Sequence, residues 1–269
     1  MGKSKVNQYK ASRAATQKQR VEENLVTLGL KGMLYSYEQI AKLALENSST
    51  HYDFFESLLE NELNLKEDSR ILRWIKQARF PFEATIKEFD FEWPKKINKQ
   101  KILELASCRF IDKSENVIFL GPPGLGKTHL AISLGREAIN NGHDVKFLAL
   151  DKLIEQVEKT IDNGAALHRT LASFLRPKLL ILDEVDIHET QERTSKFLFQ
   201  LLYQTHEKGS TIFTSNKAFS EWRKIFGDKT KADMIFDRIL HHSTIIPIEG
   251  DSYRIKDKLK KLAESHVNK

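Results

Sequence analysis

Residues 121–128 read Gly-Pro-Pro-Gly-Leu-Gly-Lys-Thr, which fits the spacing G-x-x-x-x-G-K-[ST]. Glycines at these positions let successive backbone N–H groups point at phosphate oxygens, and the start of a following helix adds its positive dipole end. We expect Lys127 to reach the β- and γ-phosphates of a nucleotide and the Thr128 hydroxyl to bind Mg²⁺. The predicted nucleotide contacts here are Gly121, Pro122, Pro123, Gly124, Leu125, Gly126, Lys127 and Thr128.

The sequence on either side of this loop supplies the setting that the motif requires. Residues 116–120 form a short apolar run typical of a buried parallel strand, and residues 129–141 have helical periodicity. Because strand, loop and helix follow in order, we predict nucleoside triphosphate binding rather than a chance Gly/Pro turn.

Two further apolar runs end in polar residues. Residues 178–184 read Lys-Leu-Leu-Ile-Leu-Asp-Glu, the pattern of a Walker B strand. We predict that Asp183 holds Mg²⁺ and contacts the nucleotide, and that Glu184 polarises the water that attacks the γ-phosphate. Residues 210–216 end in Asn216, a candidate contact for that water or for the γ-phosphate. A cap on the following turn is the alternative for Asn216.

Cysteine content and hydropathy exclude several classes of protein. The single cysteine, Cys108, cannot form a disulfide framework or a cysteine-based zinc site. No apolar run approaches the ~18 residues of a membrane span, and the start of the chain lacks a signal-peptide core. We therefore expect a cytoplasmic protein with no membrane partner.

The positive charge is concentrated at the start of the chain. The net charge is +6, and residues 1–20 contain no acid but carry six basic residues, Lys3, Lys5, Lys10, Arg13, Lys18 and Arg20. A short, basic, acid-free arm can neutralise DNA phosphates. A solvated tail that only aids solubility is the alternative.

Hydrophobic periodicity organises the rest of the chain. Strands that alternate with helices after the phosphate loop indicate an α/β fold with a doubly wound parallel sheet, preceded by a small helical domain. An aromatic linker connects the helical domain to the α/β domain, and we expect it to dock on a neighbouring domain rather than stack on bases. The predicted parts are a basic disordered arm (1–20), a helical N-terminal domain (21–80), the aromatic linker (81–100), an ATPase domain (101–258) and a C-terminal tail (259–269).

A second basic surface precedes the linker. Arg70, Arg73 and Lys76 are turned away from the apolar face of a predicted helix. They are candidates for DNA contact, and a solvated helix back is the alternative.

The order of the phosphate loop, the Walker B strand and Thr-Ser-Asn at 214–216 resembles the AAA+ P-loop ATPases of the DnaC/IstB group. Within that group the IstB-type transposition helpers are most similar. Later residues continue the match, with Phe-Asp-Arg-Ile-Leu-His-His at 236–242 and Gly-Asp-Ser-Tyr-Arg at 250–254. Further matching pieces lie at 28–33, 78–81, 90–91 and 219–222, so the resemblance covers residues 21–258.

This resemblance implies a Mg²⁺-dependent ATPase that forms homo-oligomers with ATP between subunits. Arg238 is then an arginine finger that acts in trans, with a salt bridge to Asp233 or Asp237 as its alternative, and Arg254 contacts the nucleotide. The resemblance further implies binding of double-stranded DNA without strong sequence preference and delivery of a target site to a cognate transposase. The helical pair after the second strand would then face DNA through Lys152, Lys159 and Arg169.

Residues 185–189 depart from the pattern of this group, because many relatives carry a glycine and an apolar loop there.

Three other functions compete with the transposition helper. A loader of the replicative helicase uses the same ATPase module, but the N-terminal pieces match the transposition helpers. A small-molecule kinase is disfavoured by Asn216, Arg238 and Arg254, and a non-hydrolysing binding module is disfavoured by Glu184.

Overall fold

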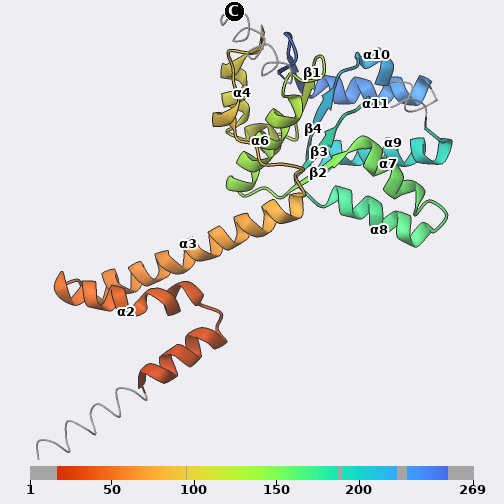
Figure 1. Cartoon of the computed structure of the whole chain (residues 1–269). Helices are drawn as coiled ribbons and strands as arrows, with labels where there is room; N and C mark the ends of the chain where they lie inside the picture. The colour runs from red at the N-terminus through yellow and green to blue at the C-terminus, as the bar shows by residue number, and fades with distance from the viewer. Residues whose placement is uncertain (1–16, 95, 187–189, 223–228, 254–269) are drawn as a thin grey trace, which may run out of the picture. The chain divides into compact units, whose positions relative to one another are not determined.

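The computed structural model describes residues 17–94, 96–186, 190–222 and 229–253 (Figure 1). The chain divides into two compact units, Met1–Arg73 (unit 1) and Trp74–Lys269 (unit 2). Each unit is described by itself below. Among the described residues, no helix has the length and apolar character that a membrane crossing requires.

Unit 1 is helical, as its apolar spacing predicts. Residues 17–27 form a helix that begins within the last residues of the expected arm. Two longer helices follow, α2 (Lys31–Glu46) and α3 (His51–Ala78), the second of which continues into unit 2. At the crossing of α2 and α3, a side chain on Gly32 would meet the backbone oxygen of Asn61 at 2.6 Å, so the two helices approach closely. Glu62 of α3 accepts the N–H of Met33 at 3.1 Å and thereby caps the start of α2.

Unit 2 contains a sheet of five parallel strands in the order β2-β3-β4-β1-β5. This arrangement confirms the predicted parallel sheet, and the three runs expected at 116–120, 178–184 and 210–216 match strands to within one residue. The strands are β1 (Asn116–Leu120), β2 (Val145–Ala149), β3 (Leu179–Asp183), β4 (Ser210–Ser215) and β5 (Ser243–Pro247).

The helices of unit 2 lie between and before these strands. The linker contains a short 3-10 helix, η1, and two short helices, α4 and α5, precede β1. Their bounds, with those of the later helices, are η1 (Ile86–Glu88), α4 (Lys99–Leu105), α5 (Arg109–Asp112), α6 (Lys127–Asn140), α7 (Leu150–Glu158), α8 (Gly164–Leu175), α9 (Glu192–Lys208), α10 (Phe219–Trp222) and α11 (Lys229–His241).

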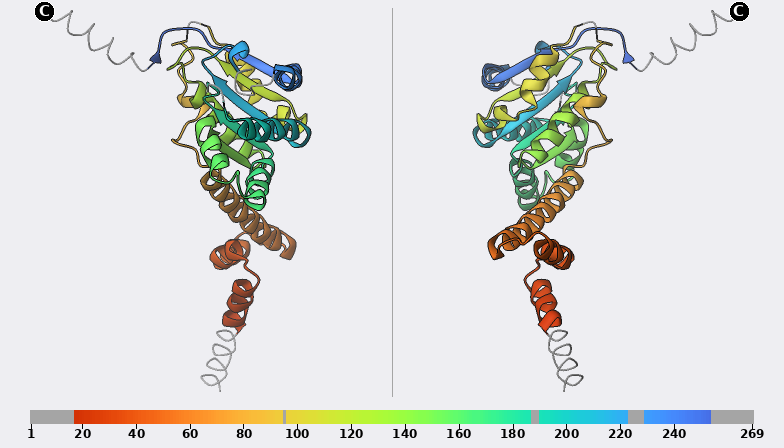
Figure 2. Two further views of the ribbon diagram at one scale, coloured as in Figure 1. Left: turned by 90° about the vertical axis from the view of Figure 1, so that its right-hand side faces the viewer. Right: turned by 90° about the vertical axis from the view of Figure 1, so that its left-hand side faces the viewer.

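Helices cover both faces of the sheet, which makes it doubly wound (Figures 1 and 2). On one face α6 packs so closely that a side chain on Gly135 would meet Ile181 Cδ1 at 2.8 Å. On the other face α7, α8, α9 and α11 enclose a core with Leu180, Leu182 and Phe213 of the sheet. Strand residues alternate between the two faces, so β3 reads as one continuous apolar run.

The carboxyl ends of all five strands meet at one edge of the sheet, because the strands are parallel. The phosphate loop follows β1, the two acids end β3, and Asn216 follows β4. Since β3, β4 and β1 are adjacent, the three sequence signals converge on this edge.

Candidate nucleotide-binding site

The phosphate loop turns sharply between β1 and α6 because its glycines adopt conformations that other residues avoid. Gly121 has φ 154° and Gly126 has φ 80°. A side chain at Gly121 would also meet the carbonyl oxygen of Ile248 at 2.1 Å, and one at Gly126 would meet the ring of Phe89 at 2.6 Å. Both conformation and packing therefore require glycine at these two positions.

Lys127 is the first residue of α6, and its ammonium lies inside the loop. Lys127 Nζ donates to the carbonyl oxygens of Gly121 at 2.7 Å and Pro122 at 2.8 Å. The loop's own backbone therefore holds the cation where the helix dipole is also positive.

The second residue of α6 contacts the end of β3. Thr128 Oγ1 donates to the Asp183 carboxylate, with distances of 2.9 and 3.1 Å to its two oxygens. Asp183 is 5% exposed, and this burial raises the pKa of its carboxyl. Hydrogen bonds from Thr214 and Thr128, and the nearby charge of Lys127, oppose that shift. A hydroxyl beside a carboxylate is a suitable pair of oxygen ligands for Mg²⁺, which in nucleotide sites takes few protein ligands.

Glu184 follows Asp183 at a turn of the backbone. Its φ is 55°, a left-handed conformation that is unusual for a residue with a side chain. Its N–H donates to Thr214 Oγ1 at 2.9 Å. Glu184 is exposed at the rim of the site, where a carboxylate can reach a bound water.

Asn216 is placed by a carboxylate from the loop after β3. Its backbone N–H donates to Asp186 Oδ1 at 2.9 Å, and Ser215 Oγ lies 2.6 Å from the same oxygen. Trp222 Nε1 in turn donates to Ser215 Oγ at 3.0 Å. Asp186 is one of the residues that depart from the expected loop pattern, and residues 187–189 of that loop lie outside the described part of the chain.

These groups border one cavity of about 590 Å³, a size typical of sites for small ligands. The predicted residues that line it are Pro123, Gly124, Leu125, Gly126, Lys127, Thr128, Asp183, Glu184 and Asn216. The structure therefore brings the phosphate loop, the Walker B acids and the candidate sensor together.

The aromatic linker forms another wall of this cavity. Thr85 and Glu88 form a capping box that starts η1 and leads into Phe89. Phe89 packs on the phosphate loop and against His129, and His129 Nε2 lies 2.9 Å from the carbonyl oxygen of Thr85. Farther along, Trp93 Nε1 donates to the carbonyl oxygen of Asp251 at 2.9 Å. The expectation that the linker docks on its neighbouring domain is thus met.

Two arginines, Arg238 and Arg254, are expected near the γ-phosphate. Arg238 lies on α11, and its guanidinium carbon is 4.5 Å from the centre of the Tyr203 ring of α9. A guanidinium stacked on an aromatic ring keeps its charge and its fork of donors. Arg254 lies outside the described residues.

The basic residues expected to contact DNA lie in several environments. Lys3, Lys5, Lys10 and Arg13 lie outside the described residues, Lys18 pairs with Glu38, and Arg20 is exposed. Arg70 is bonded to Glu67 of the same helix, while Arg73 and Lys76 are exposed.

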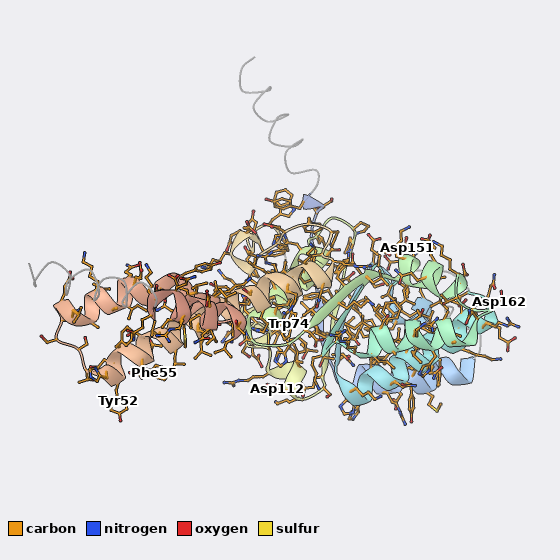
Figure 3. The ribbon with its side chains drawn as sticks, turned by 90° about the horizontal axis from the view of Figure 1, so that it is seen from below. Tyr52, Phe55, Trp74, Asp112, Asp151 and Asp162 are labelled. Atoms are coloured by element: carbon orange, nitrogen blue, oxygen red, sulfur yellow. The ribbon has the colours of Figure 1, made fainter. Side chains whose placement is uncertain are left out.

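The helical pair after β2 carries the remaining candidates. Asp151 stands at the start of α7 and Asp162 in the turn before α8 (Figure 3). Lys152 and Lys159 both bond to Glu155, and these bonds lower the pKa of Glu155 to about 2. Arg169 of α8 is exposed.

Several residues of the site were missed from sequence. Thr214 and Asp186 line the cavity although the sequence motifs give neither of them a role of its own, and Phe89, Trp93 and Tyr253 line it as well. The position of Thr214, at the carboxyl end of a strand and two residues before Asn216, could have indicated that it lines the site. No local signal in the linker indicates which surface it covers.

The comparisons with known proteins agree with this geometry. The family model for IstB-like ATP binding proteins matches residues 23–261. A Pseudomonas aeruginosa protein, whose name assigns it to insertion sequence IS21 and to ATP binding, is 39% identical over 89% of this chain and 90% of its own length. A Geobacillus stearothermophilus protein, named likewise for insertion sequence IS5376, is 37% identical over 90% and 96%.

Among solved structures, the replication initiator DnaA bound to AMPPCP and single-stranded DNA has a similar fold. The TM-score is 0.53, with 20% identity over 68% of this chain and 56% of that one. At this identity the likeness concerns the fold alone.

Proposed function

We propose that this chain, which belongs to the family of IstB-like ATP binding proteins, is the ATP-dependent DNA-binding helper of a transposase. It is an AAA+ ATPase associated with insertion sequences. In this role the protein binds double-stranded DNA with little sequence preference, prepares a target site and stimulates its transposase. The observation that carries the ATP-dependent part is the hydrogen bond between Thr128 and Asp183, which joins the phosphate loop to the Walker B strand. The names of the relatives favour transposition over helicase loading.

The residues of the site have separable roles in hydrolysis. Loop N–H groups and Lys127 bind the phosphates, and Glu184 takes the proton of the attacking water as general base. Asn216 orients that water or the γ-phosphate. Thr128 and Asp183 would hold Mg²⁺, which neutralises charge on the β- and γ-phosphates.

Arg238 is proposed to serve the site of a neighbouring subunit. Its stacking on Tyr203 supports this role, because the ring holds the guanidinium without neutralising it. Hydrolysis would then depend on assembly, since the transition-state charge on one subunit's ATP is stabilised by the next subunit.

A mixing experiment tests the trans arrangement. Arg238→Ala should bind ATP without hydrolysing it, and Lys127→Ala should neither bind nor hydrolyse. Mixed oligomers should recover activity, because some interfaces pair an intact Lys127 with an intact Arg238. No recovery at any ratio, with oligomers intact, would assign Arg238 to its own subunit or to packing.

DNA binding is tested by its dependence on nucleotide and salt. Glu184→Gln with ATP and Mg²⁺ should bind duplexes of unrelated sequence with similar affinity, and ADP should weaken that binding. Each phosphate contact contributes about −0.9 to the slope of log affinity against log salt. Deleting residues 1–20 should therefore flatten the slope if the arm lies on DNA. An unchanged slope would mean that the arm is a solvated tail. Equal DNA affinity with ATP and with ADP would contradict the proposed function.

A further inference from the structure

Thr214 joins the two acids of the Walker B strand to the neighbouring strand. The register of β3 and β4 pairs Leu182 with Phe213, so the next residues along, Asp183 and Thr214, lie side by side. Thr214 is 1% exposed and borders the cavity of the site.

The Thr214 hydroxyl bonds both acidic residues at once. Its proton is donated to Asp183 Oδ1 at 2.5 Å, and its oxygen accepts the N–H of Glu184 at 2.9 Å. A hydroxyl has one proton and two lone pairs, so the two bonds do not compete. The same residue's carbonyl oxygen accepts the N–H of Val185 at 2.8 Å. Thr214 thus receives two successive N–H groups at the point where the chain leaves β3.

The backbone at this point requires such support. Glu184 has φ 55°, and a residue with a side chain persists in this region only where its surroundings hold it. The turn sets the direction in which the Glu184 side chain leaves the backbone. On the other side, Asp183 is held between the hydroxyls of Thr214 and Thr128.

We propose that Thr214 is the positioning residue for ATP hydrolysis: its hydroxyl orients Asp183 toward Thr128 and holds the Glu184 backbone in the turn that directs the carboxylate into the cavity. This inference rests on the roles proposed above for Asp183 and Glu184. The competing view is that Thr214 is an ordinary buried strand residue, for which only the shape of the side chain matters.

Two substitutions at one position separate the views. Thr214→Val keeps the shape and removes the hydroxyl, whereas Thr214→Ser keeps the hydroxyl and removes a methyl group. The Val variant should lose about 10²-fold in kcat, the scale of loss that misplaced reacting groups produce. The KM for ATP should change far less than kcat, because the phosphate loop is untouched. The Ser variant should retain most of the rate.

Two measurements address position directly in the full-length protein. Hydrogen exchange at the amides of Glu184 and Val185 should accelerate in the Val variant but not in the Ser variant. Titration of ATP binding with Mg²⁺ should show a Mg²⁺ requirement raised about 10- to 100-fold in the Val variant, the usual effect of removing a group that orients a metal ligand. Affinity for ATP in EDTA should stay the same in both.

Thr211→Val is the matched control, because Thr211 is also 1% exposed on β4 but lies at the opposite end of the strand from the site. It should leave kcat, exchange at Glu184 and the Mg²⁺ requirement unchanged. Should Thr214→Val fold poorly, Thr214→Ala adds no atoms and carries the same test.

Wild-type kcat and amide exchange in Thr214→Val would overturn the inference. Equal losses in the Val and Ser variants would overturn it as well, since the hydroxyl would then be irrelevant. Glu184→Gln separates this failure from that of the proposed function. If Glu184→Gln hydrolyses ATP normally, the proposed function fails; if only Thr214→Val behaves normally, the inference alone fails.

Discussion

Unit 1 and unit 2 both contain helices with apolar residues at helical spacing, but the two units bury their apolar side chains to very different extents. Among the described residues of unit 1, the buried apolar side chains are Met33 and Leu58, each 8% exposed. Unit 2 encloses continuous cores on both faces of its sheet. The exposed large apolar residues of unit 1 are Val21, Val26, Leu28, Tyr35, Leu43, Leu45, Tyr52, Phe55, Leu59, Leu63 and Leu72.

The difference follows from architecture. A sheet offers two flat apolar faces that helices can cover, whereas a few helices alone enclose little volume. Tyr52 and Phe55, for example, extend from α3 and are 87% and 55% exposed (Figure 3). An apolar stripe therefore predicts a helix in either unit, but it does not predict that the stripe is covered.

A matched pair of phenylalanines, both on helices, gives the strongest test of this difference in burial between the two units. Phe174 of α8 is 0% exposed, and Phe174→Ala should destabilise the protein by about 3–5 kcal/mol through lost burial and a cavity. Phe55→Ala should change stability by less than about 1 kcal/mol. Urea unfolding followed by circular dichroism and tryptophan fluorescence measures both. Equal losses of unfolding free energy in the two variants would mean that Phe55 is buried in a core and is not exposed.

The crossing of α2 and α3 gives the next largest effect. Gly32→Ala places a methyl group 2.6 Å from backbone atoms of Asn61 and Glu62, which should cost about 1–3 kcal/mol in overpacking. Hydrogen exchange of the α2 amides should accelerate, while the amides of β1 and β3 stay protected.

Gly164→Ala is the control for this substitution, because outside its own turn of helix no atom lies within 4 Å of the added methyl group. It should be neutral or stabilising by up to about 1 kcal/mol. If Gly32→Ala proved as harmless as the control, the close crossing in unit 1 would be refuted.

Lys146 on β2 gives the smallest effect, and that effect depends on pH. Burial, with the charge of Arg79, lowers the pKa of Lys146 to about 8. The unfolded chain holds this proton up to about pH 10.5, so stability should rise with pH between 8 and 10.5 as the folded protein releases the proton first. Lys146→Met should therefore raise Tm at pH 7, and the gain should shrink toward pH 10.

The ammonium of Lys146 also donates to Ser173 and lies 4.1 Å from the centre of the Phe174 ring, contacts that favour the charged form. If they dominate, Lys146→Met will instead lower Tm at pH 7. Lys196→Met is the control, because its exposed ammonium pairs with Glu192 on the surface of α9. It should change Tm little at pH 7, as surface substitutions do.

Much of unit 2 could be predicted from the sequence because its signals are local. The loop at 121–128 needs glycine for backbone reasons, and β3 and β4 are short apolar runs with polar ends. Because the strands are parallel, their order is enough to predict that Lys127, Asp183 and Asn216 lie at one edge of the sheet.

The remaining features depend on contacts between residues far apart in the chain. Phe89 lies against Gly126, and Trp93 bonds to Asp251, so the covering of the site by the linker follows from tertiary packing. The left-handed backbone of Glu184 depends on Thr214, thirty residues later. Arg70 is a local exception, because its guanidinium bonds to Glu67 three residues earlier on α3, a neighbour that helical periodicity places within reach.

One paired measurement on Glu184→Gln decides whether the cavity of unit 2 hydrolyses ATP with Glu184 as the base. The steady-state rate of phosphate release and the affinity for ATP are measured on the same preparation as the wild type. Hydrolysis should fall by about 10²-fold or more while the affinity for ATP is retained, because the phosphate loop is intact. Hydrolysis at the wild-type rate in this variant would rule out Glu184 as the base.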